Sequence, residues 1–420
     1  MVMRSLYTPR LVDECLARLT TRFPAVLVTG PRAAGKTTTA ERIAPSVVRL
    51  DRPKEKAAYR ADPDAVLARV AKQAEPPILL DEWQEVPEIL GAVKRSVDRD
   101  PTPGRFILTG SVRADLDTPS WPGTGRLIRV RMAPLTVVER AGGDLNVARS
   151  TIDRLFEEGP AFLLDRTSAL AVDEYLDLAL DGGWPPLLGL SASADRSTWL
   201  AAYVDQLVTR DAARIGGRQD PEGLRRWLRA YAANVATATD QKTVYDAAGV
   251  SKATGEAYAA LLEALLIVTP IPAWWTNELK RLAKRPKLGL VDTGLLRPLL
   301  GLDTLGVLKE GRHGQVVEAF VASQLHALAG VASTPARPYH LRGLDGREVD
   351  LVLERPDRRI VAIEVKAGSS PSRADAMNLE WLREKWGDRL CAAVVAHTGP
   401  AAFELGDGIV ACPIGSLLGL

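Results

Sequence analysis

The chain has 420 residues, 46% of them hydrophobic and 25% charged, which excludes a disordered protein and leaves room for about two to four domains. Its formal net charge of +2 gives no global sign of a nucleic-acid partner, so any such signal has to be local. Three cysteines without C-x-x-C spacing and four histidines without paired spacing argue against a disulfide framework and a zinc site. No apolar stretch reaches the ~20 residues that span a bilayer, and residues 1–13 lack a secretory leader pattern, so we expect a cytoplasmic protein that does not enter a membrane.

A complete G-x-x-x-x-G-K-T motif lies near the amino terminus. It follows the apolar run 25–28 and precedes the helix-like run 38–43, which is the strand–loop–helix setting of a phosphate-binding loop. The glycines let successive backbone N–H groups point at the phosphates, Lys36 would reach the β- and γ-phosphates, and the Thr37 hydroxyl would hold Mg²⁺. A glycine-rich turn with a solvated lysine is the plain alternative, but the setting favours binding of ATP with Mg²⁺. The residues expected to hold the nucleotide are Gly30, Pro31, Arg32, Ala33, Ala34, Gly35, Lys36, Thr37 and Thr38.

Strands and helices alternate from about residue 23 to residue 140. Helical runs at 37–44, 64–73 and 87–98 separate most of the strands. Apolar strands that alternate with helices predict a parallel sheet that is covered on both faces. The expected strands are 25–29, 47–51, 77–80, 105–109 and 127–132.

Polar residues follow the third and fourth expected strands. Asp81 is expected to hold Mg²⁺ and Glu82 to polarise the attacking water, because ligands bind at the carboxyl ends of strands in such sheets. Thr109 or Ser111, at the end of the next strand, would lie beside the γ-phosphate and report its presence, although a simple turn there is an alternative. These side chains complete a predicted site for ATP hydrolysis.

Arginines gather at the last expected strand of this region. Arg126, with Arg129 and Arg131 as the other candidates, is a predicted arginine finger that would touch the nucleotide of a neighbouring subunit. Such a role in trans requires a homo-oligomer, for which a closed hexameric ring is one form. Solvated charges on an edge strand are an equally good reading of the same residues.

These motifs together resemble a large prokaryotic family of AAA-superfamily ATPases with a conserved carboxyl-terminal region. The resemblance implies that the loop lysine and the acidic pair bind and hydrolyse the nucleotide, which places those roles on Lys36, Thr37, Asp81 and Glu82. Ala33 and Ala34 stand where the family often has a longer or β-branched pair, and this changes side chains but not the backbone. The residues that carry the resemblance are Phe23-Pro24, Val28-Thr29-Gly30-Pro31-Arg32, Gly35-Lys36-Thr37-Thr38, Leu80-Asp81-Glu82, Leu108-Thr109-Gly110-Ser111 and Ala133-Pro134-Leu135-Thr136.

The remainder of the chain predicts three further domains. We expect an ATPase core at 1–145, a helical lid or linker at 146–236, a winged-helix domain at 237–310 and a nuclease-like α/β domain at 311–420. Helical runs at 152–158, 172–180, 196–214 and 223–236 support the linker. A helix at 243–248, a turn at Gly249 and a helix from Ser251 to about 266 give the helix-turn-helix pattern, and 267–272 with 287–291 would form a small wing.

Basic residues within the expected winged helix form a local positive patch. Such a patch would neutralise DNA phosphates without reading sequence, although winged helices also serve as protein-interaction or purely structural modules. The residues expected to contact DNA are Lys252, Lys280, Arg281, Lys284, Arg285 and Lys287.

An acid cluster marks the expected carboxyl-terminal domain. Segments 349–354 and 359–366 alternate as a hairpin, which brings Asp350 opposite Glu364 with Lys366 on the same face. Two facing carboxylates repel, and a divalent cation would relieve the repulsion, so we expect a metal at Asp350 and Glu364. Together with Glu318 on the preceding helix, this arrangement resembles the PD-(D/E)xK nuclease superfamily, although the usual Pro before the Asp is Val349 here. An ion-paired strand surface or a decayed nuclease is the alternative.

These elements together favour an ATP-driven motor or remodeller acting on DNA, of the helicase, translocase or branch-migration type. The nuclease-like domain would grip the DNA, non-specifically or by its structure. The alternative is a nucleotide-gated regulatory or defence scaffold in which ATP switches conformation without translocation. A small-molecule kinase is disfavoured because no acceptor-site constellation accompanies the loop.

Overall fold

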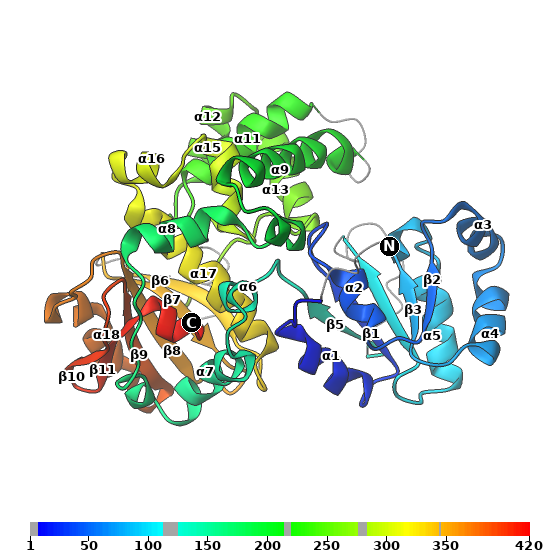
Figure 1. Ribbon diagram of the computed structural model, residues 1–420, viewed down its shortest axis with the longest axis horizontal. Coiled ribbons are helices and arrows are strands. Elements are labelled where there is room, and N and C mark those ends of the chain that lie inside the picture. Colours follow the sequence, from blue (N-terminus) through cyan, green and yellow to red (C-terminus); the bar gives the residue numbers. More distant parts are fainter. Residues whose placement is uncertain (1–6, 112–124, 214–219, 276–283, 344–345) are drawn as a thin grey trace. The chain divides into compact units, whose positions relative to one another are not determined.

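A computed structural model describes residues 7–111, 125–213, 220–275, 284–343 and 346–420 of the chain (Figure 1). The chain divides into two compact units, Met1–Pro134 with Ala264–Leu266, and Leu135–Glu263 with Ile267–Leu420. In these described parts, no helix is both long and apolar enough to cross a bilayer.

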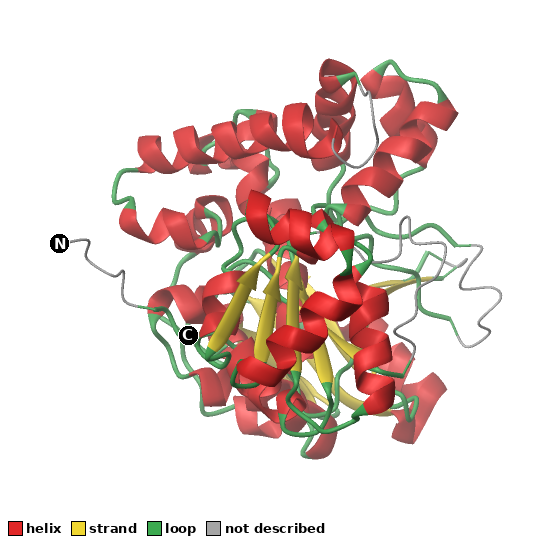
Figure 2. Cartoon of the chain, turned by 90° about the vertical axis from the view of Figure 1, so that its right-hand side faces the viewer, coloured by secondary structure: helices red, strands yellow, loops and turns green. Residues whose placement is uncertain are grey.

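The first unit is built on a five-stranded parallel sheet of order β2-β3-β4-β1-β5. Figure 2, viewed from the side on which α3 and α4 lie in Figure 1, shows these strands running in one direction. Its elements are α1 (Val12–Thr20), β1 (Ala25–Thr29), α2 (Lys36–Glu41), β2 (Ser46–Arg49), α3 (Pro53–Ala61), α4 (Pro63–Gln73), β3 (Ile78–Asp81), α5 (Ile89–Arg99), β4 (Phe106–Gly110) and β5 (Leu127–Arg131), with a 3₁₀ turn at Trp83–Glu85.

Both faces of this sheet are buried, as the apolar strands predict. Ala25 and Leu27 of β1 share a core with α4 and α5, whereas the alternate residues Val26 and Val28 lie on the face that α1 and α2 cover. The prediction of a parallel P-loop core is confirmed. Its strand boundaries differ from the predicted ones by at most two residues, and β1 has the predicted bounds.

The second unit combines a helical part with a six-stranded mixed sheet. Its helices are α6 (Val137–Ala141), α7 (Leu145–Glu157), α8 (Val172–Asp181), α9 (Ser193–Gln206), α11 (Pro221–Ala233), α12 (Gln241–Ala248), α13 (Lys252–Ala264), α15 (Leu296–Leu300), α16 (Thr304–Lys309), α17 (His313–Val331), α18 (Arg373–Trp386) and α19 (Ile414–Leu418). Its strands are β6 (Arg337–Arg342), β7 (Glu348–Glu354), β8 (Ile360–Lys366), β9 (Leu390–His397), β10 (Phe403–Gly406) and β11 (Ile409–Pro413), in the order β10-β11-β9-β8-β7-β6.

The sheet of the second unit is also buried on both faces. Val352 and Ala362 belong to a core that includes α18, while the alternate residues Leu351 and Ile363 are equally buried on the face covered by α7 and α17. Strands β7 and β8 are antiparallel, with Leu351 opposite Ile363. The predicted hairpin is therefore present in the predicted register.

A helix pair and two paired extended segments occupy the expected winged-helix region. Helices α12 and α13 are joined by a turn at Gly249, whose φ of 65° is left-handed. After α13, residues 267–271 pair antiparallel with residues 287–291, and we call the segments 267–274 and 284–291 the β-arm; Thr269 N–H donates to the Gly289 carbonyl at 2.7 Å. The β-arm also meets the edge strand β6, because the Trp274 N–H donates to the His340 carbonyl at 2.6 Å.

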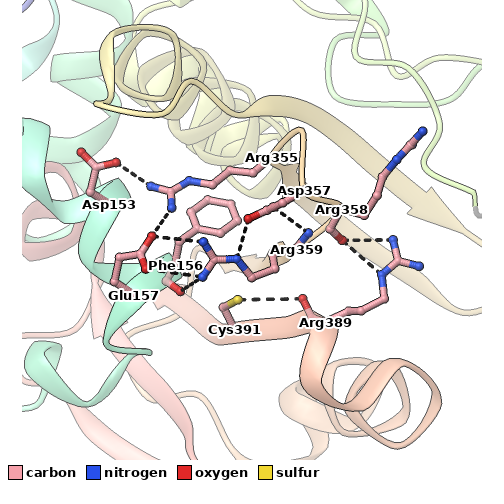
Figure 3. Close-up of polar contacts among 9 residues, drawn as sticks. All are labelled: Asp153, Phe156, Glu157, Arg355, Asp357, Arg358, Arg359, Arg389 and Cys391. Atoms are coloured by element: carbon pink, nitrogen blue, oxygen red, sulfur yellow. Dashed lines mark hydrogen bonds and ion pairs between the residues drawn. The ribbon is translucent and has the colours of Figure 1, made fainter.

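Helix α7 is fastened to the turn between β7 and β8 (Figure 3). The buried guanidinium of Arg355 forms ion pairs with Asp153 and Glu157 and lies 4.2 Å from the ring centroid of Phe156. Arg359 also pairs with Glu157, at 3.2 Å. These contacts explain why α7 is part of the second unit.

Two helix boundaries differ most from prediction, for local reasons. Helix α7 begins at Leu145, seven residues before the predicted start at residue 152, because the Asp144 carboxylate accepts the Asn146 N–H at 2.8 Å and caps the helix. Helix α9 ends at Gln206 and passes into a π-helical turn at Leu207–Asp211, where one continuous α-helix was predicted.

Candidate functional site

The phosphate-binding loop joins β1 to α2 at the carboxyl edge of the first sheet. Gly30 packs so closely on the β5 side that a β-carbon there would lie 2.3 Å from the Met132 carbonyl oxygen. Gly35 has a φ of 95° directly before α2, a conformation that glycine adopts without strain. Glycine is therefore required at position 30 by close packing and at position 35 by a left-handed backbone conformation.

Lys36 is buried at the start of α2 and bonds within the loop. Its Nζ donates to the carbonyls of Gly30 at 3.1 Å and Pro31 at 2.9 Å, and to the Ser111 hydroxyl at 2.9 Å. Burial lowers the pKa of Lys36 to about 8, against the opposing effect of the nearby carboxylates of Glu82 and Asp81. Ser111, the alternative to Thr109 in the sequence, is thus a partner of the loop lysine.

Asp81 is the centre of the acidic part of the site. Its Oδ1 accepts the Thr37 hydroxyl at 2.7 Å and also the Thr109 hydroxyl, and its Oδ2 lies 3.4 Å from Arg49 Nη1. A hydroxyl and a carboxylate in contact at the start of the loop helix are the oxygen donors that Mg²⁺ takes in nucleotide sites, so these residues fit the ion. The predicted roles of Thr37, Asp81 and Thr109 stay predictions, but the three side chains lie together.

Glu82 follows Asp81 in a left-handed conformation with a φ of 58°. Its carboxylate accepts a hydrogen bond from the Gln84 side-chain amide. Burial raises the pKa of Glu82, while the Lys36 ammonium opposes the rise. The adjacent Gly110 leaves space for this turn, because a β-carbon there would lie 2.2 Å from the indole nitrogen of Trp83.

Two arginines reach this site that the motif analysis did not identify. Arg10 is only 4% exposed, and its guanidinium donates to the carbonyls of Ala34 at 2.8 Å and Ala133 at 2.7 Å, so it links the phosphate-binding loop to the segment after β5. Arg49 ends β2, opposite Asp81 in the register with β3. A basic residue at the end of a strand in this sheet was a usable signal for Arg49, whereas no local pattern marks Arg10.

Arg126 does not join this site within the chain. It lies just before β5, at the amino edge of the sheet, and its Nε pairs with Asp98 at 2.8 Å. Arg131, at the other end of β5, is level with Thr29 at the end of β1 and so lies at the edge that carries the loop. A role of Arg126 in trans stays a prediction.

The predicted nuclease-like residues also lie near one another, at the ends of β7 and β8 and on α17. Asp350 Oδ2 accepts the Val365 N–H at 2.9 Å, and the Lys366 ammonium lies 3.0 Å from Glu364 Oε1. Burial and the nearby Asp350 raise the pKa values of both Glu318 and Glu364. The spatial grouping of Glu318, Asp350, Glu364 and Lys366 is as predicted.

One prediction about this cluster is wrong. Lys287, expected on a DNA-binding surface, is 1% exposed, and its Nζ contacts Glu318 at 2.6 Å, Glu348 at 2.9 Å and Asp350 at 3.0 Å. The physical reason is that the Lys287 ammonium is held by three carboxylates in the interior of the domain. The predicted metal at Asp350 and Glu364 stays a prediction; among the described residues no group of three or more His, Cys, Asp or Glu side chains is arranged to hold a metal ion.

The other residues of the predicted basic patch are partly engaged. Lys252 is exposed and lies 3.7 Å from Glu256, Arg285 pairs with Asp240 at 2.6 Å, and Lys284 Nζ donates to the Arg342 carbonyl at 3.0 Å. Lys280 and Arg281 lie outside the described residues.

Comparison with known proteins assigns the chain. The model described as "AAA domain" matches residues 22–141, and two models described as domains of unknown function, DUF8612 and DUF4143, match residues 172–306 and 313–417. The "Uncharacterized protein Rv2008c" of Mycobacterium tuberculosis and the "Uncharacterized protein Mb2031c" of Mycobacterium bovis are each 30% identical over 412 residues, covering 96% of this chain and 83% of the relative. The chain belongs to this family of AAA-domain ATPases with a carboxyl-terminal DUF4143 domain.

A solved structure was also found, described as "The walker-type atpase paby2304 of pyrococcus abyssi". It is 12% identical with a TM-score of 0.40, and the match covers 69% of this chain and 94% of that one. A likeness of that extent supports no conclusion about the activity of this AAA-domain protein.

Proposed function

We propose that this AAA-domain protein hydrolyses ATP at the site formed by the loop, Asp81 and Glu82. The observation that carries the proposal is the contact of the Thr37 hydroxyl with Asp81 Oδ1 at 2.7 Å, next to the buried Lys36. Mg²⁺, when bound by Thr37 and Asp81, would neutralise charge that develops on the phosphates.

The residues of the chain then divide the work. Lys36 exchanges its bonds to the loop carbonyls for bonds to the β- and γ-phosphate oxygens, which are stronger because they are charge-assisted. Glu82 accepts a hydrogen bond from the attacking water and orients it toward the γ-phosphate. Gln84, which donates to the Glu82 carboxylate, holds that side chain in place.

Two substitutions test this division. Lys36→Ala should abolish ATP binding, whereas Glu82→Gln should keep binding and lose turnover, because it removes only the charge that polarises water. Glu88→Gln, at an exposed glutamate of the same segment, is the matched control. Normal turnover of the Glu82→Gln protein with intact binding would refute the assignment.

As a finer proposal, ATP turnover drives action on DNA. Lys252, Lys284 and Arg285 remain as exposed or half-exposed basic residues in the helix pair and β-arm, and they support contacts to phosphates. DNA-stimulated hydrolysis distinguishes this proposal from the alternative of a nucleotide-gated scaffold, which needs no stimulation. The assay compares single-stranded, duplex and branched DNA.

Association into a homo-oligomer, including a hexameric ring, is a separate proposal. It rests on the arginines at the two ends of β5, of which Arg131 lies at the edge that carries the loop. A monomer found by light scattering during turnover, with ATP and DNA present, would refute it.

A further inference from the structure

The acid cluster of the second unit already contains a cation that is part of the chain. The Lys287 ammonium has three N–H donors, and one carboxylate oxygen each from Glu318, Glu348 and Asp350 lies 2.6–3.0 Å away. The buried ammonium therefore has a full set of acceptors. Burial alone would lower the pKa of Lys287, but Asp350, Glu318 and Glu348 together raise it above its ordinary value.

The three carboxylates are already occupied by the ammonium at hydrogen-bond distances. Mg²⁺ holds oxygen ligands at about 2.0–2.1 Å and Ca²⁺ at about 2.3–2.6 Å. All three carboxylates here converge on Nζ at the longer distances of N–H···O bonds. The second oxygen of Asp350 is also used, because it accepts the Val365 N–H at 2.9 Å.

The lysine comes from the β-arm and not from the strands that carry the acids. The Lys287 N–H and carbonyl both pair with Ile271 at 2.9 Å, which fixes the backbone from which the side chain extends. The β-arm is held on β6 by the Trp274–His340 bond and by His340 Nε2, which lies 3.0 Å from the Arg285 carbonyl. The pairing within the β-arm and the contacts of the β-arm with β6 thus position the ammonium in the cluster.

We propose that Lys287 is a built-in counter-ion that stands in for a divalent cation, so that the carboxyl-terminal domain binds no metal and cleaves no phosphodiester bond. One further observation supports a vacated ligand role: Glu364 is 6% exposed, and its Oε2 has no hydrogen-bond partner. That oxygen is the type of ligand a divalent ion would take, and Lys366 serves only the other oxygen of the same carboxylate, at 3.0 Å. The inference does not depend on ATP hydrolysis in the first unit.

The experiment is a titration of the full-length, nucleotide-free protein with Mn²⁺, followed by electron paramagnetic resonance. The wild type and Asp350→Asn should show the same weak background, with no saturable site below ~1 mM. Lys287→Met, which keeps a four-atom unbranched stem and removes the charged end, should gain one Mn²⁺ per chain. Adding Asp350→Asn to Lys287→Met should abolish that gain, and Lys252→Met, at an exposed lysine, should behave as the wild type.

Each result decides the proposal. Saturable Mn²⁺ binding by the wild type that Asp350→Asn removes would overturn it, and so would a folded Lys287→Met protein that binds no Mn²⁺. If Lys287→Met unfolds because three buried carboxylates repel, its thermal midpoint should recover in millimolar Mn²⁺ but not in KCl of the same ionic strength. Failure of Mn²⁺ to restore the fold would equally overturn the proposal.

Discussion

Arg10 offers the sharpest test of how the nucleotide loop is held in shape. Arg10→Met keeps most of the apolar stem but removes the N–H groups that bond the carbonyls of Ala34 and Ala133 at 2.8 and 2.7 Å. A buried carbonyl left without a partner costs about 1–3 kcal/mol, so the two together predict a loss of about 2–6 kcal/mol in the free energy of unfolding of the first unit. We also expect ATP affinity to fall about tenfold or more, because the loop must then be ordered during binding.

The assay for Arg10→Met has two readouts. Urea unfolding gives the change in stability, and titration with a fluorescent ATP analogue gives the change in affinity. Arg22→Met, at an exposed arginine in the same amino-terminal segment, is the control and should change neither quantity. If Arg10→Met matches Arg22→Met in both readouts, the guanidinium does not support the loop.

Three further predictions concern the same chain. Burial lowers the pKa of Lys36 to about 8, and phosphate groups favour its charged form, so ATP binding should require proton uptake above pH ~8. In calorimetric titrations the affinity for ATP should not depend on this group below that pH and should fall above it. Gly110→Ala should destabilise the first unit by about 1–3 kcal/mol in thermal unfolding, because its β-carbon would lie 2.2 Å from the indole nitrogen of Trp83. The control is Gly330→Ala, at a helical position with open space, which should be neutral or slightly stabilising. Equal effects of the two substitutions would refute the packing argument. If the β-arm contacts DNA, removing Lys284 and Arg285 should reduce the slope of log K against log[salt] by about 1–2, and an unchanged slope would place the contact elsewhere.

The nucleotide site could be predicted from the sequence because its signals are local. The loop glycines, Lys36 and Thr37 lie within eight consecutive residues, and Asp81 ends a buried strand that Glu82 directly follows. The parallel order of the strands then brings Asp81 to the loop without further information. Arg10 could not be predicted in this way, because its partners Ala34 and Ala133 are backbone carbonyls that any sequence provides.

The hairpin of the second unit was predictable for the same reason, but its chemistry was not. Alternation placed Asp350 and Glu364 in register, since a strand of period two fixes which side chains share a face. In the sequence Lys287 is one member of a run of basic residues, and nothing in that run distinguishes it from Lys284. The position of its side chain in the acid cluster depends on the pairing of residue 287 with Ile271 and on the contact of the β-arm with β6.

The two acid groups of this chain show how the same residue type acquires different chemistry from its neighbours. Asp81 faces the hydroxyls of Thr37 and Thr109, which are neutral and can rotate to give their oxygens to a cation. It also pairs with the half-exposed Arg49, at the longer distance of 3.4 Å. Asp350 instead faces the buried Lys287 ammonium, which is held by two other carboxylates and cannot leave without exposing all three to mutual repulsion. Breaking a buried ion pair by removing one partner costs about 3–5 kcal/mol, so the binding free energy of a metal that displaced Lys287 would be reduced by that amount. On this argument we expect divalent-ion chemistry at the nucleotide site of the first unit, with the acids of the second unit neutralised as part of its fold.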